Sequence, residues 1–183
     1  MILTLALEGA LVVFFIYFGL SALSLGFSKR SAPFISLPES ELKKLLEKLE
    51  LDDESIFYDL GSGDGRVLLA AQDLAPQSTI TGVEKNLLPY LISLWKRSRC
   101  GSGHIVIVHA SFEEVPLTDA THLFAFLQHA PMQELRPKLE RELREGAKLL
   151  SVSFPIIGME PTKTFTLNTD PSALIQKAYL YTF

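Results

Sequence analysis

One stretch, from Ile56 to Arg66, constrains the fold more than any other part of the chain. It begins with an apolar run that ends in Asp59, and three glycines follow at alternate positions: Gly61, Gly63 and Gly65. An apolar helical pattern starts directly afterwards. Glycine adopts the positive φ of tight turns and leaves room for a ligand, and a helix N-terminus offers unpaired N–H groups. The stretch therefore predicts a strand, a turn and a helix that form a nucleotide-type cradle.

The spacing of the glycines distinguishes among nucleotide sites. A dinucleotide site needs Gly-x-Gly-x-x-Gly, but Arg66 stands at the last of these positions, and the Gly-Lys-Ser/Thr ending of a phosphate-binding loop is absent from the sequence. What remains is acid-x-Gly-x-Gly-x-Gly, which resembles the first motif of class I S-adenosylmethionine (SAM) methyltransferases. SAM carries a cationic sulfonium and an ammonium group, so the carboxylate of Asp59 suits it better than it suits a pyrophosphate. Asp64 is the expected N-cap of the following helix.

A second acidic residue supports a bound nucleoside. Residues 79–84 are typical of the next strand, and Glu84 lies at its C-terminal end. A carboxylate at that place can accept both hydroxyls of a ribose, which NAD and SAM share. The glycine spacing therefore selects the cofactor, and Glu84 indicates the nucleoside. We expect SAM to be held by Asp59, Gly61, Ser62, Gly63, Gly65 and Glu84.

Short apolar runs alternate with helical patterns along the rest of the chain. Further strands are expected at residues 79–84, 104–109, 121–127, 147–154, 163–167 and 177–183. Helical periodicity covers residues 39–49, 87–99 and 131–143. In the second of these helices, the side chains expected to face the core are Leu88, Leu91, Ile92 and Trp95. The pattern predicts an α/β fold with a Rossmann-like, doubly wound, mostly parallel sheet of seven strands.

The carboxyl ends of the strands are where ligands of open parallel sheets bind. After the third strand, Ser111 could offer a hydrogen bond and Phe112 could lie against an adenine ring, although an ordinary loop explains both residues equally well. After the fourth strand, which we expect beside the first, Gln128 and His129 stand where a substrate would meet the methyl donor. Ser111 and Phe112 are thus candidate cofactor contacts, and Gln128 and His129 are candidate catalytic residues.

The N-terminal segment differs in composition from the rest. From Gly9 to Phe27 no residue is charged, and as a helix this run would be about 28 Å long, near the thickness of a hydrocarbon core. A signal peptide would carry basic residues before the run, whereas the first basic residue is Lys29. The segment predicts a single transmembrane helix. The basic residues after it place the rest of the chain on the cytoplasmic or mitochondrial matrix side.

Three regions follow from these patterns: an anchor at residues 1–30, a proline linker with the first helix at 31–50, and a SAM-binding domain at 51–183. The linker is either a spacer or, through Phe34, part of the site. The net charge of -4 gives no electrostatic reason to expect nucleic acid as a partner. No Cys or His cluster in the sequence has the spacing of a metal site, so no metal is expected.

Together these features resemble one branch of the superfamily, the membrane-anchored lysine methyltransferases of the ATP synthase c-ring protein and the adenine nucleotide translocase. The resemblance rests on the N-terminal span and on five segments: residues 33–38, 59–66, 82–86, 126–127 and 152–155. It implies that Pro33 and Phe34 line the site. Family members tend to carry an aspartate near position 111, so Ser111 would be its substitute in the adenine contact.

The resemblance implies a SAM-dependent protein-lysine N-methyltransferase whose substrate is a membrane protein with a methylatable lysine. A neutral amine would displace the methyl group from sulfonium directly, so position and orientation supply most of the rate. Gln128 and His129 would orient the amine, and Phe154 and Glu160 would lie in the substrate pocket. Two alternatives stay open: a methyltransferase for a lipid or other small molecule at the membrane, and a non-catalytic SAM-binding assembly factor.

Overall fold

The computed structural model describes residues 11–16, 39–101, 104–168 and 175–183. The chain divides into two compact units, Met1–Ile35 and Ser36–Phe183. In the first unit, residues 11–16 are helical and their side chains are exposed. None of the helices in the described ranges has both the length and the apolar character needed to cross a membrane. Most of the predicted span from Gly9 to Phe27 lies outside these ranges, as do Pro33 and Phe34.

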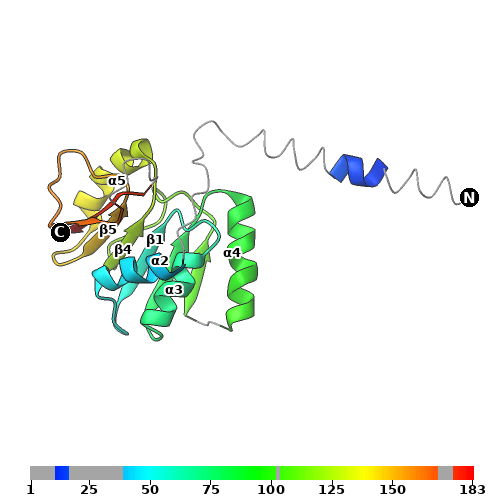
Figure 1. Ribbon diagram of the computed structural model, residues 1–183, viewed down its shortest axis with the longest axis horizontal. Coiled ribbons are helices and arrows are strands. Elements are labelled where there is room, and N and C mark those ends of the chain that lie inside the picture. Colours follow the sequence, from blue (N-terminus) through cyan, green and yellow to red (C-terminus); the bar gives the residue numbers. More distant parts are fainter. Residues whose placement is uncertain (1–10, 17–38, 102–103, 169–174) are drawn as a thin grey trace, which may run out of the picture. The chain divides into compact units, whose positions relative to one another are not determined.

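The second unit is built on a seven-stranded sheet with the order β3-β2-β1-β4-β5-β7-β6. Figure 1 labels the central strands β1, β4 and β5. Its strands are β1 (Ile56–Leu60), β2 (Thr79–Val83), β3 (Ile105–Val108), β4 (His122–Ala125), β5 (Lys148–Val152), β6 (Lys163–Thr166) and β7 (Lys177–Thr182). Strands β1 to β5 pair in parallel, and β7 is antiparallel to both β5 and β6. The predicted doubly wound, mostly parallel sheet is confirmed. Its order reverses between β1 and β4, where such folds bind ligands.

Helices cover both faces of the sheet. They are α2 (Glu39–Leu46) with a following 3-10 turn (Glu47–Leu49), α3 (Arg66–Leu74), α4 (Leu87–Cys100) and α5 (His129–Glu142). The core on the side of α2 and α3 contains Phe57, and the core on the side of α5 contains the next residue, Tyr58. Because successive side chains of a strand point to opposite faces, two covered faces require the continuous apolar runs seen in the sequence.

The orientation of α4 differs from the prediction. Leu88, Leu91, Ile92 and Trp95 were expected in the core, but they are 38–57% exposed. The buried residue of α4 is Ser93, because the helix approaches the glycine turn closely: a Cβ atom on Gly65 would lie 2.9 Å from the Ser93 Cβ. Apolar periodicity does not detect a contact made by a small polar residue, so it selected the wrong face.

Helix α5 begins two residues earlier than predicted, at His129, with Gln128 as its N-cap. Pro131 therefore lies in the first turn, where its missing N–H breaks no intrahelical hydrogen bond. The inward residues Met132, Leu135 and Leu139 are fully buried against the second core, as the spacing predicts.

Candidate functional site

The glycine turn is fixed to the end of the neighbouring strand. The backbone N–H groups of Gly61 and Ser62 both donate to the Val83 carbonyl oxygen, at 2.8 and 3.0 Å. Gly61, Gly63 and Gly65 have φ values of 85°, 54° and 80°, which disfavour any residue with a side chain. The alternate spacing of the glycines is thus required by the backbone of the turn itself.

Two of these glycines also allow close packing. A Cβ atom on Gly61 would lie 2.7 Å from Leu127 Cδ2, which follows β4. Gly65 is the N-cap of α3 and is held against Ser93 of α4 as described above. Asp64 is therefore not the N-cap, contrary to the prediction. The turn is the point at which β1, β4, α3 and α4 meet.

Glu84, at the end of β2, connects the turn to the following loop. Its Oε2 accepts the Gly63 N–H at 2.9 Å, and its Oε1 accepts the backbone and side-chain N–H groups of Asn86 at 2.7 and 2.8 Å. A carboxylate has about four acceptor positions. Three of these positions are occupied, and the free one is on Oε2. A ribose whose two hydroxyls bind both carboxylate oxygens therefore requires the side-chain amide of Asn86 to turn away from Oε1. Ribose binding by Glu84 stays a prediction.

Asp59 is a buried polar residue with an unsatisfied side-chain atom. Its carboxylate is 1% exposed, and its Oδ2 has no hydrogen-bond partner among the described residues. Burial raises the pKa of Asp59 well above its usual range, and the negative charges of Glu84 and Asp64 add to the effect. The buried Ser62 hydroxyl also lacks a partner among the described residues. Such groups are stabilised by a ligand that brings a positive charge and N–H or O–H donors, which are the groups SAM carries.

Asp64 has a structural role. Its carboxylate accepts two hydrogen bonds from the Arg66 guanidinium and pairs with the Lys96 ammonium of α4. Burial opposes ionisation, but these hydrogen bonds outweigh it and lower the pKa of Asp64 to about 2. Asp64 therefore connects the start of α3 to α4 as a permanent carboxylate. The sequence alone did not reveal Lys96 as its partner, because the two residues are 32 positions apart.

The predicted catalytic residues lie beside the turn. Leu60 of β1 and Ala125 of β4 are paired in register, so the segments that follow both strands leave the sheet at the same edge. Gln128 is half-buried and His129 is exposed, and both stand at the start of α5. The catalytic roles of these two residues stay predictions.

The loop after β5 carries the other predicted substrate contacts. The Phe154 carbonyl accepts the Ser151 hydroxyl at 2.6 Å, and the Phe154 side chain is half-buried, whereas Glu160 is exposed. The side-chain amide of Gln133 on α5 fixes this loop: it donates to the Pro155 carbonyl at 3.1 Å and accepts the Ile157 N–H at 2.9 Å. Sequence reasoning missed Gln133, since a polar residue on the flank of a helix gives no distinctive signal.

The predicted adenine contacts lie after β3. Ser111 is half-buried, and its N–H donates to the Glu114 carboxylate at 2.8 Å. Phe112 is 8% exposed and belongs to the core on the side of α5. Most of the Phe112 ring therefore has protein neighbours already. An adenine contact by either residue stays a prediction.

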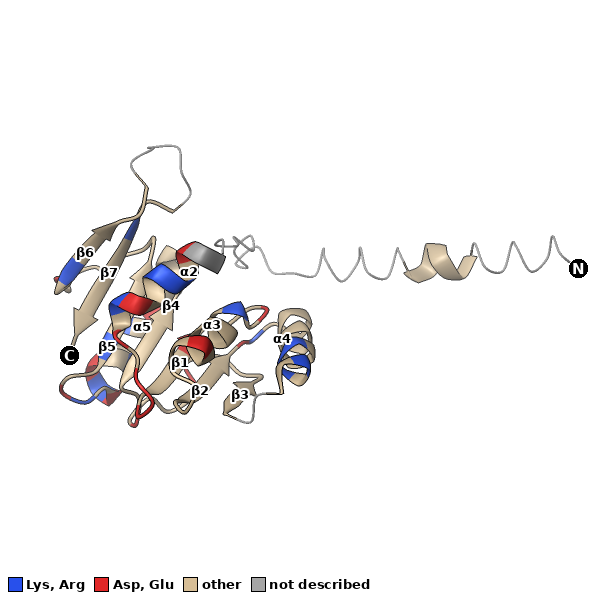
Figure 2. Ribbon diagram, turned by 60° about the horizontal axis from the view of Figure 1, so that its bottom comes forward, with Lys and Arg blue, Asp and Glu red and all other residues tan. Residues whose placement is uncertain are grey.

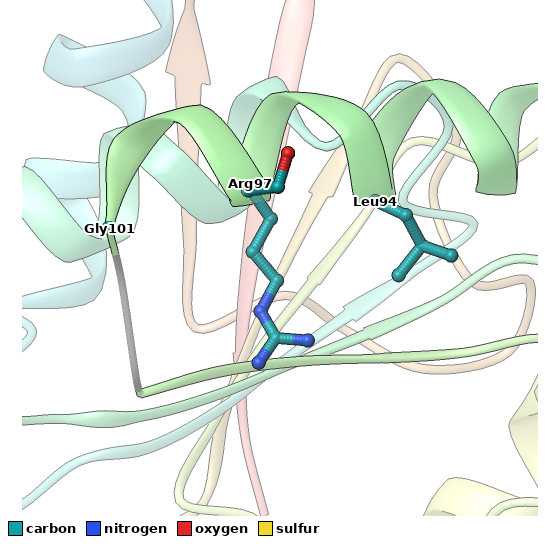
Figure 3. Close-up of a pocket in the computed structure, with 4 residues that line it drawn as sticks. Leu94, Arg97 and Gly101 are labelled. Carbon is teal, nitrogen blue, oxygen red and sulfur yellow. The ribbon is translucent and has the colours of Figure 1, made fainter.

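A separate cavity of about 300 Å³ lies beside the C-terminal half of α4 and is lined by Leu94, Arg97, Ser98 and Gly101. Leu94 and Arg97 project into it from the same side of the helix (Figure 3). None of these four lining residues is a predicted site residue, so we do not assign this cavity to the site. Within the described residues, no group of three or more His, Cys, Asp or Glu side chains could hold a metal ion.

Comparisons with known proteins agree with this geometry. Residues 59–163 match the family described as "ANTKMT methyltransferase domain". A protein-lysine N-methyltransferase of Saccharolobus islandicus is 32% identical over 151 residues, which are 81% of this chain and 92% of that relative. The adenine nucleotide translocase lysine N-methyltransferase of Mus musculus is 30% identical over 141 residues, 75% of this chain and 60% of that relative. The chain thus spans less than two thirds of the mouse protein.

Solved structures show the same fold. An RNA methyltransferase from Salinibacter ruber, in complex with S-adenosyl-L-homocysteine, has a TM-score of 0.73 at 24% identity and covers 81% of this chain and 93% of its own. TrmN from Thermus thermophilus has a TM-score of 0.66 at 15% identity and covers 80% of this chain and 49% of its own. At such identities the likeness concerns the fold alone.

Proposed function

The chain belongs to the ANTKMT methyltransferase domain family, and on that premise we propose that it transfers the methyl group of SAM to the ε-amine of a protein lysine. Family membership supports SAM as the cofactor. The relative from Saccharolobus islandicus, of which the chain covers 92%, is named a protein-lysine N-methyltransferase. Lysine is therefore the best-supported acceptor.

The observation that carries the proposal is the buried Asp59, which lies beside the glycine turn and Glu84 and whose Oδ2 has no hydrogen-bond partner among the described residues. An isolated buried carboxylate is unfavourable, and a cationic ligand with hydrogen-bond donors relieves the cost. In our proposal the amino-acid end of SAM lies toward Asp59 and the ribose toward Glu84. The Ser62 hydroxyl, which has no hydrogen-bond partner among the described residues, binds a further polar atom of the cofactor.

The chain's own residues position the acceptor. When bound, SAM supplies an electrophilic methyl group on its sulfonium sulfur. The lysine must be neutral to attack, and we place it between the segments that follow β4 and β5, where partial burial would favour the neutral amine. We assign the orientation of the amine to Gln128 and His129, and the walls of the pocket to Phe154 and Glu160. Most of the rate then comes from alignment of the reacting atoms.

A membrane protein is the substrate class we favour. The mouse relative is named for the adenine nucleotide translocase, and a human relative is named for a component of ATP synthase. The uncharged segment from Gly9 to Phe27 supports a single membrane span, which would hold the domain on the cytoplasmic or matrix side. Such an anchor raises the effective concentration of the domain near membrane substrates.

The proposal is tested by incubating the full chain with SAM that carries a labelled methyl group and with native membranes, and then separating protein from lipid. We expect label in the protein fraction, on lysine side chains identified by mass spectrometry. A Gln128→Ala/His129→Ala variant should bind SAM normally but transfer little label. Label confined to lipid would instead identify a lipid methyltransferase, and SAM binding without any transfer would identify a non-catalytic factor.

A further inference from the structure

The outward face of α4 is apolar. Its exposed apolar side chains are Leu87, Leu88, Leu91, Ile92 and Trp95, which keep 38–57% of their surface accessible. Helical geometry places these residues on one continuous side of the helix, and the buried Ser93 marks the opposite side. A contiguous apolar surface of this kind indicates an interaction site.

The charges of α4 indicate the nature of the partner. The helix contains Lys96, Arg97 and Arg99 but no acidic residue, although the whole chain has a net charge of -4. Figure 2 shows blue bands and no red on α4. Within the described residues, Asp64 pairs with Lys96, and no acidic group lies within salt-bridge distance of Arg97 or Arg99. The helix is thus a local basic element in an acidic protein.

One of these basic residues, Arg99, lies at the C-terminal end of the exposed apolar face. The Arg99 guanidinium lies over the Trp95 ring, 4.7 Å from its centre. Helices that lie in the plane of a membrane interface combine an apolar face containing Trp and Leu with basic residues, and they bind anionic lipids. Tryptophan favours the headgroup level, where its ring is apolar and its N–H remains hydrated.

We propose that the outward face of α4 lies in the interfacial layer of an anionic lipid bilayer. Leu88, Leu91 and Trp95 contact the acyl boundary, and Arg99 contacts lipid phosphates. The docking does not depend on which methyl acceptor the enzyme uses. The consequence of docking for substrate choice does rest on the proposed function. Because α4 starts directly after the Glu84 loop, docking fixes the height of the cofactor site above the membrane. The enzyme then selects lysines near the bilayer surface.

Trp95 is the single tryptophan of the chain, so intrinsic fluorescence reports this face alone. The full chain is reconstituted into vesicles of phosphatidylcholine and phosphatidylglycerol, with and without bromine on the acyl chains. We expect Trp95 emission to shift to the blue, and bromine to reduce its intensity about twofold or more, because an interfacial helix buries its apolar face ~5–10 Å deep. Pure phosphatidylcholine should give weaker quenching.

Variants separate α4 from other lipid contacts. Leu88→Glu/Leu91→Glu should abolish the quenching, and Arg99→Gln should lower the ratio of docked to undocked protein about fivefold. Ile157→Glu, at an equally exposed apolar position on another element, should leave the quenching unchanged. Unshifted emission that bromine does not reduce would overturn the proposal. So would a blue shift without bromine quenching, since that result means protein covers the face. SAM binding and methyl transfer are measured separately, so failure here leaves the proposed function standing.

Discussion

At the scale of single residues, Asp59 has opposite effects on stability and on binding. A carboxylate with one unpartnered oxygen and 1% exposure destabilises the ligand-free fold, yet the same group attracts the cationic cofactor. Its folded pKa is raised, whereas the unfolded chain has the ordinary value of 3.8. The loss of folding stability caused by Asp59 is therefore absent below pH 3.8. It grows as the pH rises, until Asp59 is ionised in the folded state.

Replacing Asp59 with asparagine should separate the two effects. Asp59→Asn should raise the free energy of unfolding of the ligand-free protein at neutral pH, because a neutral amide carries no desolvated charge. The same change should weaken SAM binding ~10- to 100-fold, through loss of a charged hydrogen bond. Thermal unfolding and isothermal titration measure the two quantities. A variant that lost stability and kept full affinity would contradict the assignment.

SAM binding should also release protons. The positive charge of SAM favours the ionised form of Asp59. Molecules in which Asp59 is protonated before binding therefore lose that proton when the complex forms. Titrations in buffers of different ionisation enthalpy should show net proton release, and the apparent affinity should rise with pH until Asp59 is ionised in the free protein. Asp59→Asn should show neither effect, and a pH dependence retained in that variant would assign it to another group.

At the scale of elements, the strands and helices were largely predictable from the sequence, whereas the orientation of α4 was not. Hydrophobic periodicity located α5 correctly because its buried residues Met132, Leu135 and Leu139 are apolar. In α4 the contact that fixes the helix is made by Ser93 against Gly65, and its apolar residues face outward. Periodicity assumes that burial and apolarity coincide, and α4 violates that assumption.

Adding a methyl group at Gly65 should disturb this contact. Gly65→Ala places a Cβ 2.9 Å from Ser93 Cβ at a φ of 80°, so we expect a loss of ~2–4 kcal/mol in unfolding free energy from backbone strain and overpacking. Gly146→Ala is the matched control: its φ is 84°, but nothing lies within 4 Å, so it should lose only ~1 kcal/mol. Adding Ser93→Gly to Gly65→Ala should recover the part of the loss that comes from overpacking. Equal losses in Gly65→Ala and Gly146→Ala would exclude an effect of the contact between Gly65 and Ser93.

The connection between α3 and α4 should weaken in acid. The pKa of Asp64 falls from 3.8 to about 2 on folding. Its contribution to the free energy of unfolding is therefore complete above pH 3.8 and is lost as the pH drops through 2. We expect roughly 2 kcal/mol from this residue. Unfolding measured from pH 5 to pH 2 should give a flatter profile for Asp64→Asn than for the native chain. Glu134→Gln, an exposed position on α5, should keep the native profile.

The loop after β5 should depend on Gln133. Gln133→Ala removes the hydrogen bonds to Pro155 and Ile157 and frees the loop that holds the proposed substrate pocket. We expect methyl transfer to fall ~10-fold through misorientation of the acceptor, with the Kd for SAM unchanged. Glu134→Ala, the exposed neighbour on the same helix, controls for a general effect on α5. Weakened SAM binding in Gln133→Ala would show that the loop supports the cofactor instead.

At the scale of the whole molecule, the sequence predicted which residues gather at the carboxyl edge of the sheet but not how they bind one another. Asp59, Glu84 and the glycines were identified from spacing along the chain, and the structure brings them together. The spacing could not reveal that Glu84 already uses most of its acceptor positions on Gly63 and Asn86, because those bonds depend on the folded turn. Residues close in space but far apart in sequence, such as Leu127 beside Gly61, were missed for the same reason.

A crystal structure of the chain bound to S-adenosylhomocysteine would test the proposed cofactor site directly. We expect the ligand to lie over the turn from Gly61 to Gly65, with its ribose hydroxyls at Glu84 and its ammonium group toward Asp59. Asn86 should have turned its side-chain amide away from Glu84 to admit the second hydroxyl. A ligand bound elsewhere, or one that contacts neither Asp59 nor Glu84, would show that these residues do not form the cofactor site.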